Sequence, residues 1–128
     1  MAVKPATNAQ RRTLVAEALR IIDTEYATDL RLDDVARRIA TSRRQLQRSF
    51  AEVDGGGFRD ALTRRRMIEA GRLLDERPWK IRDVAAAVGY SQPAQFAKAF
   101  RAFHGHTPRA HRARGDGAAR NDATPTRA

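Results

Sequence analysis

The same pattern of residues occurs twice in this chain, over residues 32–53 and 81–103, and this internal repeat constrains the fold more than any other feature. Both copies contain apolar residues at helical spacing, an early aspartate and a central serine, and a glycine follows each copy. The shared positions are Leu32, Asp34, Val35, Ala36, Ile39, Ser42, Leu46, Phe50, Val53 and Gly55 in the first copy, and Ile81, Asp83, Val84, Ala85, Val88, Ser91, Phe96, Phe100, Phe103 and Gly105 in the second. The copies are offset by 49 residues up to the serine and by 50 beyond it, so the second copy has one more residue in its turn.

Each copy predicts a short apolar helix, a tight turn that begins at a serine, and a longer helix with basic and amide side chains. This is the pattern of a helix-turn-helix, whose second helix enters the DNA major groove. Ser42 and Gln45 form a capping-box pattern at the start of the first longer helix. Arg31 and Lys80 precede the two short helices and are poor N-caps, so these helices should depend on packing.

The charge of the chain favours a polyanionic partner. Among 128 residues, 25 are Lys or Arg and 15 are Asp or Glu, which gives a net charge of +10. The positive charge is unevenly spread, since no acidic residue lies between Val84 and Gly115. A net charge of this sign can simply aid solubility, but the clustering favours binding to nucleic acid.

Several classes of protein are disfavoured by what the sequence lacks. Without cysteine there is no disulfide, thiolate zinc site or cysteine nucleophile, and no apolar run approaches the ~20 residues that span a bilayer. The three histidines, His104, His106 and His111, do not have the spacing of a zinc site. Nucleotide-binding and serine-nucleophile motifs are missing as well. We therefore expect a cytoplasmic protein that is not an enzyme and has no cofactor, metal or membrane partner.

The patterning predicts an all-α fold in which two helix-turn-helix subdomains are joined by a long linker helix. The expected segments are a flexible leader at 1–8, the first subdomain at 9–57, the linker helix at 58–76, the second subdomain at 77–112, and a disordered basic tail at 113–128. The apolar positions of the linker helix run from Phe58 to Leu74, a span of ~17 residues that is ~25 Å long in an α-helix. Such a strut is expected to hold the two DNA-reading helices about one DNA turn apart, ~34 Å.

Helical periodicity separates the residues expected in the core from those expected on DNA. Leu46, Phe50 and Val53 should form the buried stripe of one longer helix, and Phe96, Phe100 and Phe103 that of the other. Polar side chains on the remaining faces are suited to guanine or adenine edges. The predicted base-reading residues are Arg44, Gln45, Gln47, Arg48, Gln92, Gln95 and Lys98. The predicted phosphate contacts are Ser42, Arg43, Arg64, Arg101, Arg109 and Arg112. For any one of these residues, a solvated charged face is the competing interpretation.

The second repeat resembles the signature of the AraC/XylS family of bacterial transcription regulators. The matching residues are Ile81, Asp83, Val84, Ala85, Gly89, Tyr90, Phe96, Phe100, Gly105, Pro108 and Arg112. The first half of the chain is similar as well. Its matching features are the expected helix from Leu32 to Ile39, then Ser42, Leu46, Phe50, Gly55 and Phe58, and Arg65 and Leu74 in the linker helix. The resemblance covers about residues 9–112. It implies a DNA-binding regulator that recognises an asymmetric promoter site and contacts RNA polymerase.

The chain departs from the family pattern at three positions. Gly71 stands where the family usually has alanine, which suggests a close backbone contact or a bend. Ala94 replaces a frequent serine and Lys98 a frequent arginine, so the first unit should carry more of the sequence readout.

Few residues precede the first predicted helix, which is similar to the stand-alone activators of the family. On this interpretation the protein is a monomer without a site for a small-molecule effector, and it is associated with the nucleoid when bound to DNA. Two alternatives remain. The chain could be the DNA-binding module of a larger DNA-repair or effector-binding regulator, or it could bind nucleic acid without regard to sequence.

Overall fold

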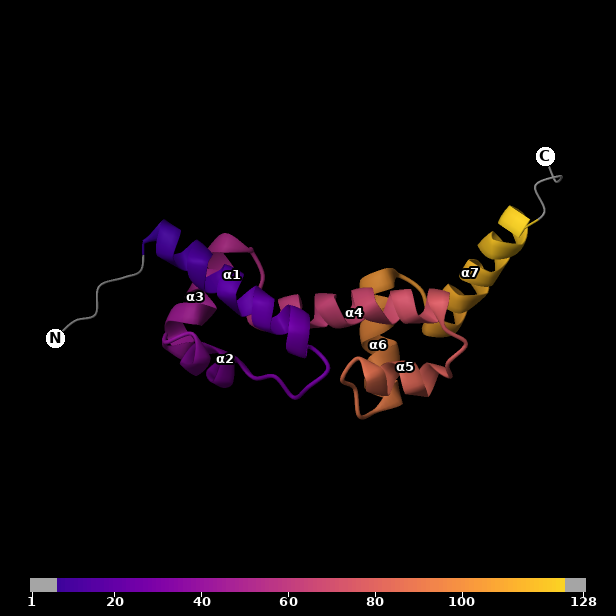
Figure 1. Ribbon diagram of the computed structural model, residues 1–128, viewed down its shortest axis with the longest axis horizontal. Coiled ribbons are helices and arrows are strands. Elements are labelled where there is room, and N and C mark those ends of the chain that lie inside the picture. The colour runs from indigo at the N-terminus through magenta and orange to yellow at the C-terminus, as the bar shows by residue number, and fades with distance from the viewer. Residues whose placement is uncertain (1–6, 124–128) are drawn as a thin grey trace. The chain divides into compact units, whose positions relative to one another are not determined.

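The computed structural model describes the backbone of residues 7–123 and the side chains of residues 7–115. Over that span the chain forms helices without any strand (Figure 1), which confirms the predicted all-α fold. The helices are α1 (Asn8–Glu25), α2 (Leu32–Arg38), α3 (Arg43–Val53), α4 (Phe58–Glu76), α5 (Ile81–Ala87), α6 (Pro93–His104) and α7 (Pro108–Ala123). In the described part of the chain, no helix combines the length and the apolar character that crossing a membrane requires.

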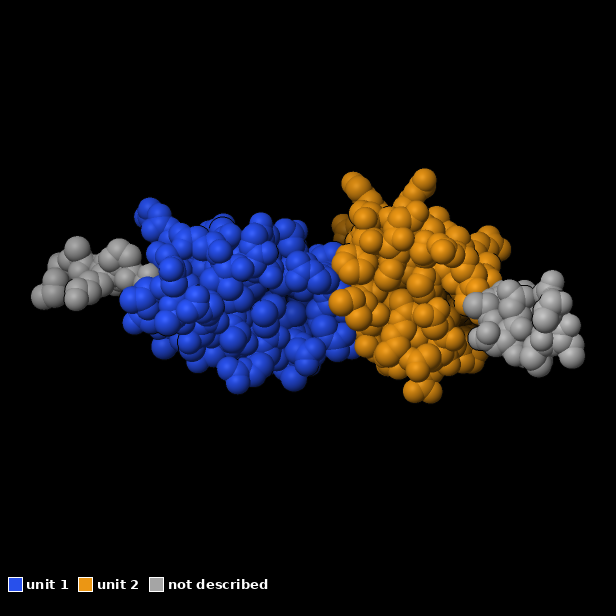
Figure 2. All heavy atoms as spheres, turned by 90° about the horizontal axis from the view of Figure 1, so that it is seen from above, with its two compact units in different colours: residues 1–65 blue, residues 66–128 orange. Residues whose placement is uncertain are grey.

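The chain divides into two compact units, residues 1–65 and 66–128 (Figure 2). The boundary lies inside α4, which begins and ends at the bounds predicted for the linker helix, Phe58 and Glu76. The first part of this helix therefore belongs to the first unit and the second part to the other. The sequence instead predicts residues 58–76 as a linker segment separate from both subdomains.

The first unit encloses a core made by one side of each of its four helical segments. Its buried apolar side chains are Val15, Ala18 and Ile22 from α1, Leu30 from the loop that follows, Val35 and Ala36 from α2, Leu46 and Phe50 from α3, and Phe58, Ala61 and Leu62 from α4. Phe50 and Phe58 meet edge to face with their ring centroids 6.0 Å apart. Arg38 in α2 also pairs with Glu25 at the end of α1, with 2.6 Å between nitrogen and oxygen. The α1, α2 and α4 segments thus hold α3 in place.

The second unit has an equivalent core, with aromatic rings in its longer helix. The buried apolar side chains are Met67, Ala70, Leu73 and Leu74 from α4, Val84 and Ala85 from α5, Val88 from the turn, and Phe96 and Phe100 from α6. The ring of Phe96 lies 5.7 Å from the rings of both Tyr90 and Phe100. These aromatic contacts fix the orientation of α6.

The two turns share one backbone design but differ in one residue. In each turn the second residue after the short helix has a left-handed conformation, and the next residue donates its N–H to a carbonyl five positions earlier, at 2.9 Å in both units. This arrangement is a Schellman motif. The left-handed residue is Ala40 in the first unit, with φ of 58°, and Gly89 in the second, with φ of 99°. Arg31 and Lys80 make no side-chain cap, as predicted from their residue types.

Two residues that were predicted to be buried are exposed. Val53 is 41% exposed and Phe103 is 42% exposed, and both stand in the last turn of their helices. In α3 the buried face includes Ser49 instead, whose hydroxyl donates to the carbonyl of Gln45 at 2.7 Å. Because that hydroxyl is satisfied within the helix, a serine can occupy a core position there.

The prediction of a disordered tail from residue 113 is corrected by the structure, in which α7 continues to Ala123. Alanine and arginine have high helix propensity and recur in this stretch, so they extend a helix that has no apolar stripe. Residues 124–128, like most of the predicted leader, lie outside the described residues. At the other end, α1 begins at Asn8, and Thr7 and Gln10 form a full capping box.

Gly71 was predicted to mark either a close contact or a bend in the linker helix, and the structure shows a close contact with two histidine rings. A Cβ atom at this position would lie 3.1 Å from Cε1 of His104 and 3.6 Å from Nε2 of His111. The ring of His104 can therefore lie directly on α4, where its Nε2–H donates to the carbonyl of Met67 at 2.8 Å. The missing side chain allows α6 and α7 to approach α4.

Candidate nucleic-acid interface

The longer helix of the first repeat, α3, presents long polar side chains on the face opposite its core contacts. Arg44 and Arg48 lie one turn apart on this exposed face, and Gln47 stands beside them. These three side chains form no hydrogen bond or ion pair with any residue that the structure describes. They are therefore free to bind an external partner, and their contact with DNA bases stays a prediction.

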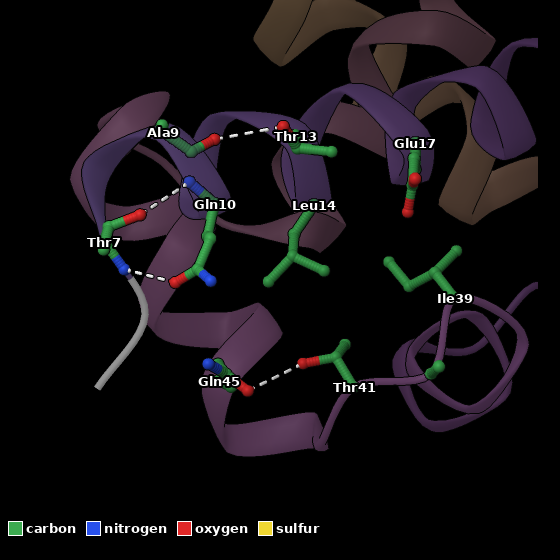
Figure 3. Close-up of a pocket in the computed structure, with 10 residues that line it drawn as sticks. Thr7, Ala9, Gln10, Thr13, Leu14, Glu17, Ile39, Thr41 and Gln45 are labelled. Carbon is green, nitrogen blue, oxygen red and sulfur yellow. Dashed lines mark hydrogen bonds between the residues drawn. The ribbon is translucent and has the colours of Figure 1, made fainter. Parts of the chain in front are cut away.

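Gln45 is directed away from this face. Its side chain is half-buried, and its Oε1 accepts a hydrogen bond from the hydroxyl of Thr41 at 3.0 Å. Figure 3 shows the two residues meeting beside an open groove of about 750 Å³ in the first unit, formed by α1, the turn and the start of α3. We therefore leave Gln45 out of the candidate interface.

Ser42 has a structural role at the start of α3. Its hydroxyl accepts from the backbone N–H of Gln45 at 3.0 Å, which is one half of the predicted capping box. The reciprocal half is missing because the Gln45 side chain bonds Thr41 instead. The hydroxyl also remains exposed, so a further contact to a phosphate is sterically open.

The longer helix of the second repeat, α6, has a less polar outward face. Lys98 and Arg101 are exposed on it, and neither forms a bond with any described residue. Gln95 is exposed on the flank, and Gln92 is the N-cap residue but makes no side-chain cap. Pro93 occupies the first turn, where its missing N–H costs nothing.

The outward faces of α3 and α6 differ in the length of their side chains when they are compared position by position. The residues of α6 that correspond to Arg44, Gln47 and Arg48 are Ala94, Ala97 and Lys98. Two long hydrogen-bonding side chains in α3 are thus replaced by methyl groups in α6. Hydrogen-bonding capacity toward base edges is concentrated in the first unit.

Of the arginines predicted to contact phosphate, some pair with carboxylates and others are free. Arg43 lies 3.6 Å from Asp33, and Arg64 lies 3.7 Å from Asp54. Such long, exposed pairs are weak and can be exchanged for an external anion. Arg109 at the start of α7 is exposed and unpaired among the described residues.

Arg112 is used inside the second unit. It donates from its guanidinium to the carbonyl of Arg77 at 3.1 Å, and its Nε lies 3.5 Å from the carbonyl of Leu74. These carbonyls lie at the C-terminal end of α4, where helical N–H partners run out. A cation there also complements the helix dipole. This geometry makes Arg112 a capping residue of α4 rather than part of a solvated face, and we leave it out of the interface.

Two positioning residues were missed in the sequence. Thr41 holds Gln45 at the start of α3, and its spacing of four residues from that glutamine was the available signal. Glu25 holds Arg38 and thereby the short helix α2, but the two residues are too far apart in sequence for any local pattern to show it. The hydrogen bond from Arg38 lowers the pKa of the Glu25 carboxyl below its usual value.

Comparison with known proteins places this arrangement among transcription regulators. Residues 35–114 match the family model of a helix-turn-helix domain. The chain is 38% identical over 96 residues to the regulatory protein PocR of Salmonella typhimurium. These matched residues make up 75% of this chain and 32% of PocR. The chain spans about a third of the length of such curated relatives.

Solved structures agree with this match. An AraC-type transcriptional regulator from Chromobacterium violaceum is similar with a TM-score of 0.78 and 28% identity, covering 84% of this chain and 96% of that one. The DNA-binding domain of the global transcriptional factor AdpA, solved in complex with a target DNA, is similar with a TM-score of 0.68 and 27% identity, covering 90% of this chain and 96% of that one. These similar proteins are regulators, in agreement with the expectation that the chain is not an enzyme.

Proposed function

Because the chain belongs to the AraC-type family of helix-turn-helix transcription regulators, we propose that it binds double-stranded DNA as a monomer, with α3 and α6 entering two successive major grooves. The observation that carries the proposal is the pair of repeats, each presenting an exposed basic face on its second helix. In the cell this places the protein in the cytoplasm, on the nucleoid when it is bound to DNA.

The first unit supplies most of the sequence recognition in this proposal. Arg44 and Arg48 suit bidentate contacts to guanine O6 and N7, and Gln47 suits adenine N6 and N7. The corresponding face of α6 offers Lys98, with Gln92 and Gln95 at its N-terminal end. Ser42, Arg43, Arg64, Arg101 and Arg109 contact phosphates and fix the register.

The test begins with selection of a binding site from a pool of random duplexes, followed by affinity measurements on the selected and a random duplex. Arg44→Ala or Arg48→Ala should weaken binding to the selected site by ~1–3 kcal/mol and relax preference at one base position. Arg20 is an exposed residue of α1, away from the candidate interface. Arg20→Ala removes the same charge there and serves as the matched control. An unchanged ratio of selected to random affinity in both variants would refute this assignment.

Stoichiometry tests the monomeric mode separately. Sedimentation with a duplex of about 20 bp should give one protein per duplex, since two helical turns accommodate both units. A strict 2:1 complex on a palindromic site would contradict the proposal. Equal affinity for selected and random duplex would instead favour sequence-blind binding.

We further propose that the protein activates transcription by contacting RNA polymerase. The support is similarity to relatives whose names describe activators, such as the transcriptional activator AarP of Providencia stuartii (29% identical over 100 residues) and the lactose operon transcription activator of Staphylococcus xylosus (31% identical over 86 residues). Transcription reconstituted from purified polymerase and a promoter carrying the selected site should rise when the protein is added. A fall in transcript would assign repression instead.

A further inference from the structure

The three histidines of the chain meet in the second unit, between α4, α6 and α7. The rings of His106 and His111 are stacked with centroids 5.1 Å apart, and the ring of His104 lies 5.2 Å from that of His111. All three are largely shielded from solvent. Among the described residues, no group of three or more His, Cys, Asp or Glu side chains is arranged so that it could hold a metal ion.

The hydrogen bonds of this cluster determine where the protons lie. Arg114 donates to Nδ1 of His106 at 2.8 Å, and arginine has no acceptor, so that nitrogen carries no proton. The proton of neutral His106 is therefore on Nε2, which lies 2.8 Å from Nδ1 of His111 and donates to it. The proton of His111 is in turn on its Nε2, which is buried.

The last nitrogen of the series faces a carboxylate. Nε2 of His111 lies 3.1 Å from Oδ1 of Asp75 on α4, which is close but is not aligned as a hydrogen bond. Arg114 on α7 thus donates to His106, His106 donates to His111, and the Nε2–H of His111 faces α4. Gly71 makes room for this arrangement, because a side chain there would press on His104 and His111.

We propose that Arg114, His106 and His111 form a proton-sensitive latch. While both histidines are neutral, this latch ties α7 to the turn between α6 and α7, and it adds to the hold that Arg112 has on the end of α4. A proton on Nδ1 of His106 would take the place of the Arg114 donor. A proton on Nδ1 of His111 would set two N–H groups against each other. Either event breaks one link, so acidification loosens α7.

Charged groups and other rings surround the cluster. Arg114 and the rings of His111 and His104 disfavour a positive charge on His106, and the carboxylate of Asp75 faces His111. Burial, followed by Arg114, His111 and His104, lowers the pKa of His106 below its usual value of about 6.5. Because the pKa of His106 is lower in the folded protein, the unfolded chain binds more protons than the folded protein once the pH falls below about 6.5. The stabilising effect is therefore present above about pH 6.5 and is lost as the pH falls.

The first test reads the tautomers in the intact protein. Long-range ¹H–¹⁵N spectra at pH 8 should show both His106 and His111 protonated on Nε2 alone. Only three histidines need to be assigned. A proton on Nδ1 of either residue at this pH would overturn the proposal, whatever any variant does.

The second test follows hydrogen exchange of the α7 amides at residues 111–115. Their protection factors should fall roughly tenfold between pH 7.5 and pH 5, the size expected from losing one charge-assisted hydrogen bond. Amides of α3 in the first unit provide the internal control and should not respond. A fall of equal size in both units would overturn the latch.

Two variants separate protonation from packing. In His106→Gln, the introduced amide can accept from Arg114 and donate to His111, so α7 should remain protected and lose most of its pH response. In His106→Ala, the protection should be low at both pH values. If His106→Gln kept the full tenfold fall, titration of His106 would not be the cause. These readouts involve no DNA, so they stand independently of the proposed function.

Discussion

The two turns offer a matched pair of substitutions, because the same left-handed position holds Ala40 in the first unit and Gly89 in the second. A left-handed conformation brings Cβ too close to the following carbonyl and costs an L-residue roughly 1–2 kcal/mol, whereas glycine adopts it freely. Ala40 is exposed, so removing its methyl group leaves no cavity. We therefore expect Ala40→Gly to stabilise the first unit.

The magnitude is a difference of two effects. Relief of the strained backbone contributes roughly 1–2 kcal/mol, and the greater freedom of glycine in the unfolded chain offsets about 0.4–1 kcal/mol of it. The net gain is about 0.5–1 kcal/mol, or a rise in Tm of about 2–6 °C for a unit of this size. Gly89→Ala should lose a similar amount in the second unit, since it introduces the same strain.

Urea and thermal unfolding of both variants, followed by resolved amide resonances in each unit, measure these changes. The single tryptophan, Trp79, lies in the second unit and provides a fluorescence signal for Gly89→Ala. A lower or unchanged Tm for Ala40→Gly would refute the reasoning, since it would mean that the left-handed turn stores no strain. The double variant should show the sum of the two effects, because the sites share no partner.

Three further outcomes are expected. Arg112→Ala should lower Tm by about 2–6 °C, because two carbonyls at the end of α4 lose a charged donor, while the salt dependence of DNA binding stays unchanged. Arg109→Ala is its matched control, and it should leave Tm unchanged while it flattens the slope of log binding constant against log salt concentration by about one unit. If Arg112→Ala instead flattened that slope and left Tm unchanged, Arg112 would be a phosphate contact after all. Gly71→Ala should destabilise the second unit by about 1–3 kcal/mol in urea unfolding, since the new Cβ would overpack the His104 ring, and a stabilised variant would contradict that contact.

The sequence by itself determined the repeat, the all-α fold and most of each core. Helical periodicity is a local property, so Leu46, Phe50, Phe96 and Phe100 could be placed in the interior from their spacing alone. The same periodicity left Arg44, Gln47 and Arg48 on the opposite face, where the structure also has them. The bounds of α4 followed from the glycines before it and the proline after it.

The tertiary structure decided the roles of individual polar side chains. Arg112 meets carbonyls more than thirty positions earlier in the chain, and His104 meets one at a similar separation, so no local pattern reveals either contact. Val53 and Phe103 follow the apolar spacing but stand in the last turns of their helices, where 41% and 42% of their surface stays exposed. A side chain's type and spacing restrict the face on which it lies. Which donor, acceptor or ring it meets there depends on segments that folding brings together from distant parts of the chain.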